Sequence, residues 1–288
     1  MLVGQDFDRF LDRALRALRP YLGDMVCVGG CANALYRFHE ASSAIELATV
    51  GTLDLDLASK RPVPVRGDCS VAQCLEKAGF REAVFGGGHE PVVRYVPQED
   101  ALACEIEFLC PATGLPNRRG GQRAAPSSRL QDGLMGQPLQ YLEILLHRPW
   151  RMDLRAVPGF ESWPAREWVQ VPNPAAYVMQ KVLIRDQRRP TESMAKDCYY
   201  IFEVSVLFRD ALDRLAADYT EMAETFPKKW FQRFEREARR LFASRDAEGA
   251  VAAMKVHRGI APSAAGGFRP DEAIVAAAVA KMLERLFS

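Results

Sequence analysis

The sequence predicts an α+β fold in which a domain built on a mixed β-sheet, residues 1–172, precedes an α-helical bundle domain, residues 173–288. Before Pro172, short apolar runs alternate with turn residues, a pattern typical of strands joined by tight connections. After Pro174, apolar residues recur about every 3.6 positions, which indicates amphipathic helices. Two segments with alternating acidic residues both lie in the first part, so we expect its sheet to carry any polar site.

The composition is that of a folded globular protein. The chain has 288 residues, of which 48% are hydrophobic and 26% are charged, and its net charge is +1. Affinity for a polyanion would therefore have to come from a local basic cluster. No apolar run reaches the ~20 residues of a membrane span, and acids near the N-terminus are unlike a signal peptide. We expect a cytoplasmic protein with no membrane partner.

The first domain is predicted to begin with a helix, a strand and a glycine turn. An amphipathic helix over 6–19 is followed by an apolar strand at 25–28, then by Gly29 and Gly30, and then by a helix over 31–39. A strand, glycines and a helix leave backbone amides free at a helix N-terminus, where a phosphate can bind, although two glycines also form ordinary turns. Further elements are a capped helix at 70–78, a hairpin at 80–85 and 91–96, a loop over 111–137, and a strand pair at 152–157 and 167–171.

Acidic residues alternate with apolar residues in two of the predicted strands. Residues 52–58 read Thr-Leu-Asp-Leu-Asp-Leu-Ala, so Asp54 and Asp56 share one face, with Cα atoms about 6.5 to 7 Å apart. In the strand expected over 101–110, Glu105 and Glu107 share a face in the same way. Asp54, Asp56 and Glu107 then offer three hard oxygen ligands on adjacent strands, which suit Mg²⁺ or Mn²⁺. On the first strand alone, two ordinary solvated acids are an equally good interpretation.

In this order the motifs resemble nucleotidyltransferases of the polymerase-beta type, and within them the toxin-like branch associated with abortive phage infection. The residues that carry the resemblance are Gly29-Gly30 with Ala34-Leu35, Asp54 and Asp56, Glu107 before Phe108-Leu109, and Lys181 with Lys196-Asp197. The resemblance covers about residues 24–110 and 173–210.

The resemblance implies transfer of a nucleoside monophosphate from a nucleoside triphosphate, such as ATP or GTP, to an acceptor hydroxyl. It implies that Asp54, Asp56 and Glu107 are catalytic and hold one or two Mg²⁺ or Mn²⁺ ions. It assigns nucleotide binding to Gly29, Gly30, Lys181, Arg185, Lys196 and Asp197. Without the resemblance, Lys181 would be interpreted as a solvated charge, and for Asp197 a structural hydrogen bond within the bundle is as good an interpretation.

We expect RNA, and tRNA in particular, as the acceptor. In the helix expected over 229–243, Arg233, Arg236 and Arg240 recur at spacings that place them on one face. Trp230 and Phe234 can stack on bases, although their spacing also fits core contacts, and a solvated basic face is the alternative interpretation. Four arginines of the loop, at positions 118, 119, 123 and 129, are second candidates. An antitoxin protein would be a partner of a toxin-like member.

Three positions depart from the resemblance. Val50 stands where relatives often have an arginine, Glu107 replaces a commoner aspartate, and Tyr200 replaces an acid. These departures support an alternative, a catalytically degenerate fold that binds nucleotides or a partner protein. A phosphatase that forms an aspartyl-phosphate also uses Asp-x-Asp, but there an apolar run precedes the pair, whereas here residues 48–52 read Ala-Thr-Val-Gly-Thr.

Overall fold

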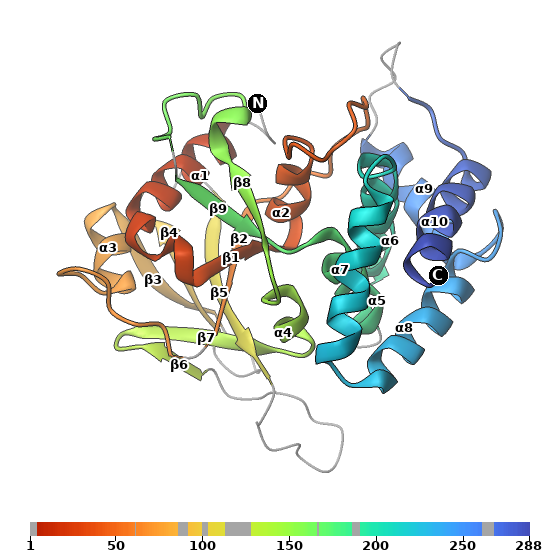
Figure 1. Ribbon diagram of the computed structural model, residues 1–288. Helices are drawn as coiled ribbons and strands as arrows, with labels where there is room; N and C mark the ends of the chain where they lie inside the picture. The colour runs from red at the N-terminus through yellow and green to blue at the C-terminus, as the bar shows by residue number, and fades with distance from the viewer. Residues whose placement is uncertain are drawn as a thin grey trace. The chain divides into compact units, whose positions relative to one another are not determined.

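The computed structural model describes residues 5–60, 62–85, 92–99, 103–112, 128–165, 167–185, 191–260 and 268–288. The chain forms two compact units, and Figure 1 shows the elements of each. Residues 1–35 and 51–172 form the sheet unit, and residues 36–50 and 173–288 form the helical unit. A mixed sheet combined with a helical C-terminal region confirms the predicted α+β class.

The sheet unit is built on one mixed sheet. Its strands follow the order β3-β4-β5-β2-β1-β9-β8, while β7 pairs with β5 and β6 pairs with β7. The strands are β1 Met25–Val28, β2 Asp54–Ser59, β3 Phe80–Phe85, β4 Val92–Pro97, β5 Glu105–Pro111, β6 Ser128–Gln131, β7 Leu134–Leu139, β8 Trp150–Asp153 and β9 Trp168–Val171. Pairing is parallel between β2 and β5, between β1 and β9, and between β5 and β7; the other pairs are antiparallel.

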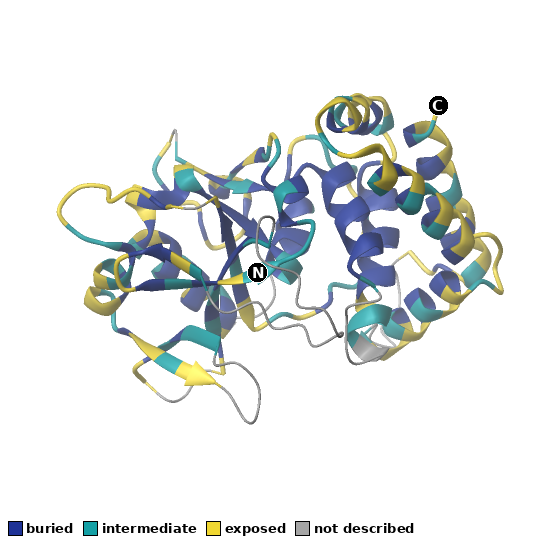
Figure 2. Ribbon diagram, turned by 90° about the horizontal axis from the view of Figure 1, so that it is seen from below, coloured by how far each residue is buried: buried dark blue, intermediate teal, exposed yellow. Residues whose placement is uncertain are grey.

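One face of β2 and β5 forms part of the core. Leu55, Leu57, Ile106 and Phe108 are buried there, as their alternation with acids predicts. Leu53 is 52% exposed because it lies just before β2 begins. Figure 2 shows the resulting burial along the middle strands of the sheet.

Short helices complete the sheet unit. They are α1 Gln5–Ala17, η1 Arg19–Asp24, α2 Gly29–Tyr36, α3 Val71–Lys77, α4 Leu142–Leu145 and η2 Leu154–Ala156. The apolar stripe of α1 is buried, and Phe10 packs edge-on against Phe80 of β3, with ring centroids 5.9 Å apart. Helix α3 begins at Ser70 with a capping box to Gln73 and ends before Gly79, whose φ is +78°.

The prediction of a loop over 111–137 was wrong for its last part. Strands β6 and β7 form an antiparallel hairpin, and β7 extends the sheet by pairing with β5. Asp132 and Gly133 make the connection, with Gly133 at φ +72°, and this Asp-Gly pair is a common hairpin turn. Leu130 and Leu134 are buried, which fixes the hairpin against the core. Arg118, Arg119 and Arg123 lie outside the described residues, as does the hairpin loop at 86–91.

The helical unit confirms the prediction of helices after Pro174. They are α5 Pro174–Leu183, α6 Thr191–Leu207, α7 Leu212–Thr225, α8 Lys228–Leu241, α9 Glu248–Ile260 and α10 Glu272–Leu286. Helix α5 begins at Asn173, whose side chain accepts a hydrogen bond of 2.7 Å from the amide of Ala176, and Pro174 suits the first turn because it lacks an amide hydrogen.

Residues 36–50 join the helical unit through polar contacts. The Arg37 guanidinium pairs with Glu203 of α6 and donates to the carbonyl oxygen of Leu47 at 2.6 Å. The hydroxyl of Tyr199 donates to the carbonyl oxygen of Ala48 at 2.6 Å. These bonds hold an irregular segment that has no strand or helix period of its own.

Candidate functional site

Strands β2 and β5 bring acidic side chains together. In their parallel register, Asp54 lies beside Glu105 and Asp56 beside Glu107. Neighbouring strands are about 4.8 Å apart, so each pair of acids is held at about that backbone spacing. Asp54, Asp56 and Glu107 therefore occupy adjacent positions on one face of the sheet, opposite the buried leucines.

Glu107 lies in an environment that disfavours its charged form. Glu107 as a whole is half-buried, but its Oε1 atom is fully buried and has no hydrogen-bond partner among the described residues. Burial raises the pKa of Glu107 to about 7, and the negative charge of Asp56 adds to the rise, whereas the charge of Arg94 opposes it. A carboxyl group with this pKa is partly protonated at neutral pH, so a nearby cation would favour its charged form.

Arg94 is a member of the group that the sequence analysis did not identify. It lies opposite Glu107 in the antiparallel pair of β4 and β5, and its guanidinium forms an ion pair with Glu105. The sequence contained an indication of this role, since Arg94 is the one charged residue in the strand predicted over 91–96. Glu105 thus has an ion-pair partner, while Oε1 of Glu107 has no hydrogen-bond partner within the ranges that the structure describes.

Gly29 is adapted to the neighbouring Asp56. Val28, the last residue of β1, lies opposite Asp56, and the chain then turns into α2 with Gly29 at φ +64°. A β-carbon at Gly29 would overlap Oδ2 of Asp56 and would lie 3.1 Å from its Cγ. Glycine is thus required both by the left-handed backbone and by the space that the Asp56 carboxylate takes. Gly30 follows in the first turn of α2.

The other residues that the resemblance assigns to nucleotide binding lie in the helical unit. Lys181 of α5 and Asp197 of α6 are each 3% exposed, and Nζ of Lys181 lies 2.8 Å from Oδ1 of Asp197. The ammonium group also lies over the rings of Tyr177 and Tyr200, 5.2 and 5.3 Å from their centroids. The interpretation of Lys181 as a solvated charge was therefore wrong, because a buried carboxylate and two rings surround it.

The two remaining assigned residues differ in their contacts. Arg185 forms an ion pair with Glu248 of α9. Lys196 is exposed on α6. Val50, where the resemblance would place an arginine, is 3% exposed.

The basic helix α8 is partly neutralised. Arg239 pairs with Glu235, and both Arg236 and Arg240 pair with Glu237. Phe234 is fully buried, so the core interpretation of this ring is the correct one. Trp230 is half-buried and stacks on Phe226, with ring centroids 6.0 Å apart.

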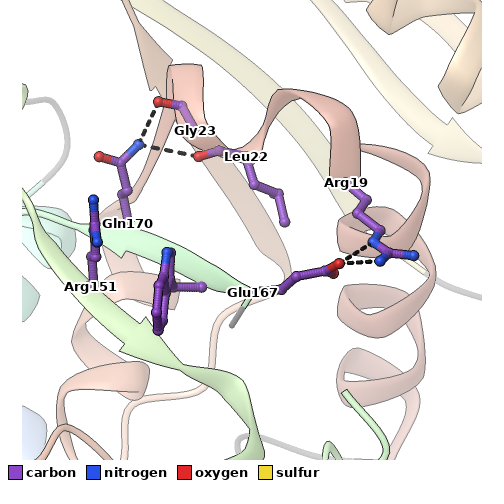
Figure 3. Close-up of a pocket in the computed structure, with 7 residues that line it drawn as sticks. Arg19, Leu22, Gly23, Arg151, Glu167 and Gln170 are labelled. Carbon is purple, nitrogen blue, oxygen red and sulfur yellow. Dashed lines mark hydrogen bonds and ion pairs between the residues drawn. The ribbon is translucent and has the colours of Figure 1, made fainter. Parts of the chain in front are cut away.

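A separate pocket of about 260 Å³ lies in the sheet unit (Figure 3). Its walls come from η1, β8, β9 and the residue that precedes β9, and none of the predicted site residues lines it. On one side the Arg19 guanidinium pairs with Glu167, and on the other the Gln170 amide donates to the carbonyl oxygens of Leu22 and Gly23 (Figure 3). Sequence reasoning gave no signal for this pocket, because its walls come from segments about 130 residues apart.

Among the described residues, no three or more His, Cys, Asp or Glu side chains are arranged to hold a metal ion, and this includes Asp54, Asp56 and Glu107. None of the described helices is both long and apolar enough for a transmembrane span.

A mixed sheet with a glycine turn beside an Asp-x-Asp strand is the arrangement of a nucleotidyltransferase-type domain. In agreement, the chain matches a family model described as nucleotidyltransferase over residues 10–224. This match covers most of the chain, from α1 to α7, and includes both acidic strands. The chain therefore belongs to this nucleotidyltransferase family. No curated protein matches it.

Proposed function

We propose that the chain transfers a nucleoside monophosphate from a nucleoside triphosphate to an acceptor hydroxyl, and that Asp54, Asp56 and Glu107 hold Mg²⁺ or Mn²⁺ for this reaction. The observation that carries the proposal is the register of β2 and β5, which sets Asp56 beside Glu107, whose Oε1 has no hydrogen-bond partner in the described part of the chain. Family membership supports nucleotidyl transfer in general terms.

The residues present fit a divalent cation. Carboxylate oxygens are the ligands that Mg²⁺ and Mn²⁺ prefer, and a buried oxygen without a hydrogen bond is costly unless a proton or a cation satisfies it. A bound divalent ion would neutralise the triphosphate and activate the acceptor hydroxyl. Because the side chains do not form a ready cluster, we expect the ion alone to bind weakly and to bind more tightly with the triphosphate, which adds oxygens.

The glycine turn is the proposed neighbour of the triphosphate. Gly29 and Gly30 are the first residues of α2, and neither carries a side chain that would keep a phosphate away from the backbone. Lys181, Arg185, Lys196 and Asp197 are proposed nucleotide-binding residues because of the family resemblance.

Titration calorimetry tests the metal site. A non-hydrolysable triphosphate should bind the parent protein in the presence of Mg²⁺ and much more weakly in EDTA. Asp54→Ala and Asp56→Ala should each reduce the metal-dependent affinity by at least about 10-fold, since each removes a charged ligand. Glu82→Ala is the matched control, because Glu82 is exposed on β3 and pairs with Tyr95, on the face opposite Arg94. Equal metal-dependent affinity in all four proteins would reject the site.

RNA, with tRNA as the preferred kind, is the proposed acceptor. On α8, Arg233 and Arg236 lie on the predicted basic face, and replacing both with alanine should lower the salt dependence of RNA binding by about 0.7 of a unit of slope for each phosphate that the variant no longer neutralises. Incubation with labelled triphosphate, Mg²⁺ and either total RNA or total protein should label RNA. Labelled protein instead would reject RNA as the acceptor. A toxin-like role with an antitoxin partner belongs to the same proposal.

One observation favours a second candidate, a degenerate fold that binds nucleotides without turning them over. Tyr200 stands where members of the resembling branch often have an acid, and its ring packs against the ammonium of Lys181. This candidate predicts metal-dependent triphosphate binding without release of pyrophosphate. A coupled pyrophosphate assay on the parent separates the two candidates, because only the enzyme releases it.

A further inference from the structure

The pocket of the sheet unit lies on the same face of the sheet as the carboxylates. Val28 lies beside Asp56, and two residues earlier Val26 lies beside Gln170, which in turn lies opposite Arg151. Paired residues and residues two positions apart share a face of a sheet. Gln170, Arg151 and Trp168 therefore share the face of Asp56.

The strand spacings give the distance from the carboxylates to the pocket. From Asp56 to Gln170 the path crosses two strand intervals and two residues, which corresponds to about 12 Å between the Cα atoms. Trp168, two residues further along β9, is about 16 Å away by the same geometry.

Three groups of the pocket define the chemistry of a ligand. Trp168 is 40% exposed, and the Arg151 guanidinium lies over its indole ring, 5.3 Å from the ring centroid. Arg151 forms no ion pair with any residue that the structure describes, so its charge is available to an anion. Oε2 of Glu167 is buried and accepts no hydrogen bond among the described residues.

A nucleotide matches these groups. Its base is a flat ring for Trp168, its phosphate is an anion for Arg151, and its ribose hydroxyls and amino groups are donors for an acceptor such as Glu167. A simple anion has no ring, and an apolar molecule leaves Arg151 unused. The positive charge of Arg19 is already offset by Glu167, so Arg151 gives the pocket its net positive charge.

We propose that this pocket binds one unpaired nucleotide of a single-stranded RNA acceptor. The base stacks on Trp168 in the place that the Arg151 guanidinium takes in the free protein, and this guanidinium turns to the phosphate. The inference rests on the proposed function, in which RNA is the acceptor, and adds to it where the RNA strand is held.

The test is RNA binding by the full chain, measured by fluorescence anisotropy with a short labelled single-stranded RNA, in EDTA and without triphosphate. Trp168→Ala should weaken binding roughly 10-fold, since one base loses its stacking partner, whereas Trp168→Phe should stay within about threefold of the parent. Arg151→Ala should lower the salt slope by about 0.7, the value for one neutralised phosphate on a single strand. The matched control is Arg9→Ala, which removes an exposed arginine of α1 that does not line the pocket.

The measured RNA affinities either support the inference or overturn it. Loss of affinity in Trp168→Ala, with Trp168→Phe and Arg9→Ala near the parent value, supports the inference. Equal affinity of Trp168→Ala and the parent, or no RNA binding by the parent, overturns it, and so does a free nucleoside monophosphate that binds as tightly as RNA. A separate titration with triphosphate and Mg²⁺ tests the proposed function, so its failure is seen independently of the pocket.

Discussion

Replacing Gly29 with alanine tests how closely the glycine turn and the carboxylate depend on each other. Gly29 and Gly67 both have a φ of +64°, but a β-carbon at Gly67 would meet no atom within 4 Å. Both alanine variants therefore carry the cost of a left-handed residue, about 1 to 2 kcal/mol. Only Gly29→Ala also overlaps Oδ2 of Asp56, so Gly67→Ala serves as the control that isolates this contact.

The magnitude follows from the overlap. Real β-carbons do not approach other atoms within 3.0 Å, so Asp56 or the turn must move by about 1 Å. A displacement of this size in a catalytic group costs roughly 100-fold in rate, because the reacting atoms lose their alignment. We expect Gly29→Ala to lose about that factor in pyrophosphate release, with a stability about 1 to 3 kcal/mol below Gly67→Ala in urea unfolding, the usual cost of overpacking. Equal turnover in both variants would refute the role given to the contact.

Two further predictions concern buried charges. Lys181→Met should lower the free energy of unfolding in urea by about 3 to 5 kcal/mol, because it leaves Asp197 buried without its ion-pair partner. Adding Asp197→Asn should recover much of this loss. Equal stability of the single and double variants would contradict the role given to this ion pair. The pKa of Glu107 is raised from its ordinary value of 4.5 to about 7, so the folded state holds this proton more tightly than the unfolded state and stability falls as pH rises between these values. Glu107→Gln should therefore gain up to about 3 kcal/mol over the parent at pH 8 and little at pH 4, and no gain at pH 8 would contradict the raised pKa.

Much of the fold could be predicted because its signals are local. The helices after Pro174 follow from an apolar period that each segment carries by itself. The hairpin of β6 and β7 was missed because Asp132-Gly133 lies at the end of a stretch rich in glycine and arginine, and its stability comes from pairing with β5. Residues 36–50 could not be assigned to the helical unit, since Arg37 reaches Glu203 across 166 positions.

Part of the candidate site could be predicted because its signal is also local, and the rest depends on contacts between distant segments. A period of two sets Asp54 and Asp56 on one face, but the register that places Asp56 beside Glu107 depends on strand pairing. Arg94 comes from a third strand, β4, whose pairing with β5 the sequence does not show. The steric requirement for glycine at position 29 depends on Asp56, which lies beside it only in the folded sheet. The burial of Lys181 depends on Asp197, one helix further along the chain, and lysine in a helix is ordinarily exposed.

The charge balance of this sheet face supports the proposed cation site. Asp54, Asp56, Glu105 and Glu107 supply four carboxylates, against which Arg94 supplies one positive charge, and that charge forms its ion pair with Glu105. Oε1 of Glu107 is buried and has no hydrogen-bond partner among the described residues, so the ion pair of Arg94 with Glu105 leaves this oxygen unsatisfied. The raised pKa of Glu107 is the cost of this arrangement, and a divalent ion would remove that cost by replacing the proton. Stability is thus reduced at the position where the proposed reaction needs charge, as is common for residues that serve function.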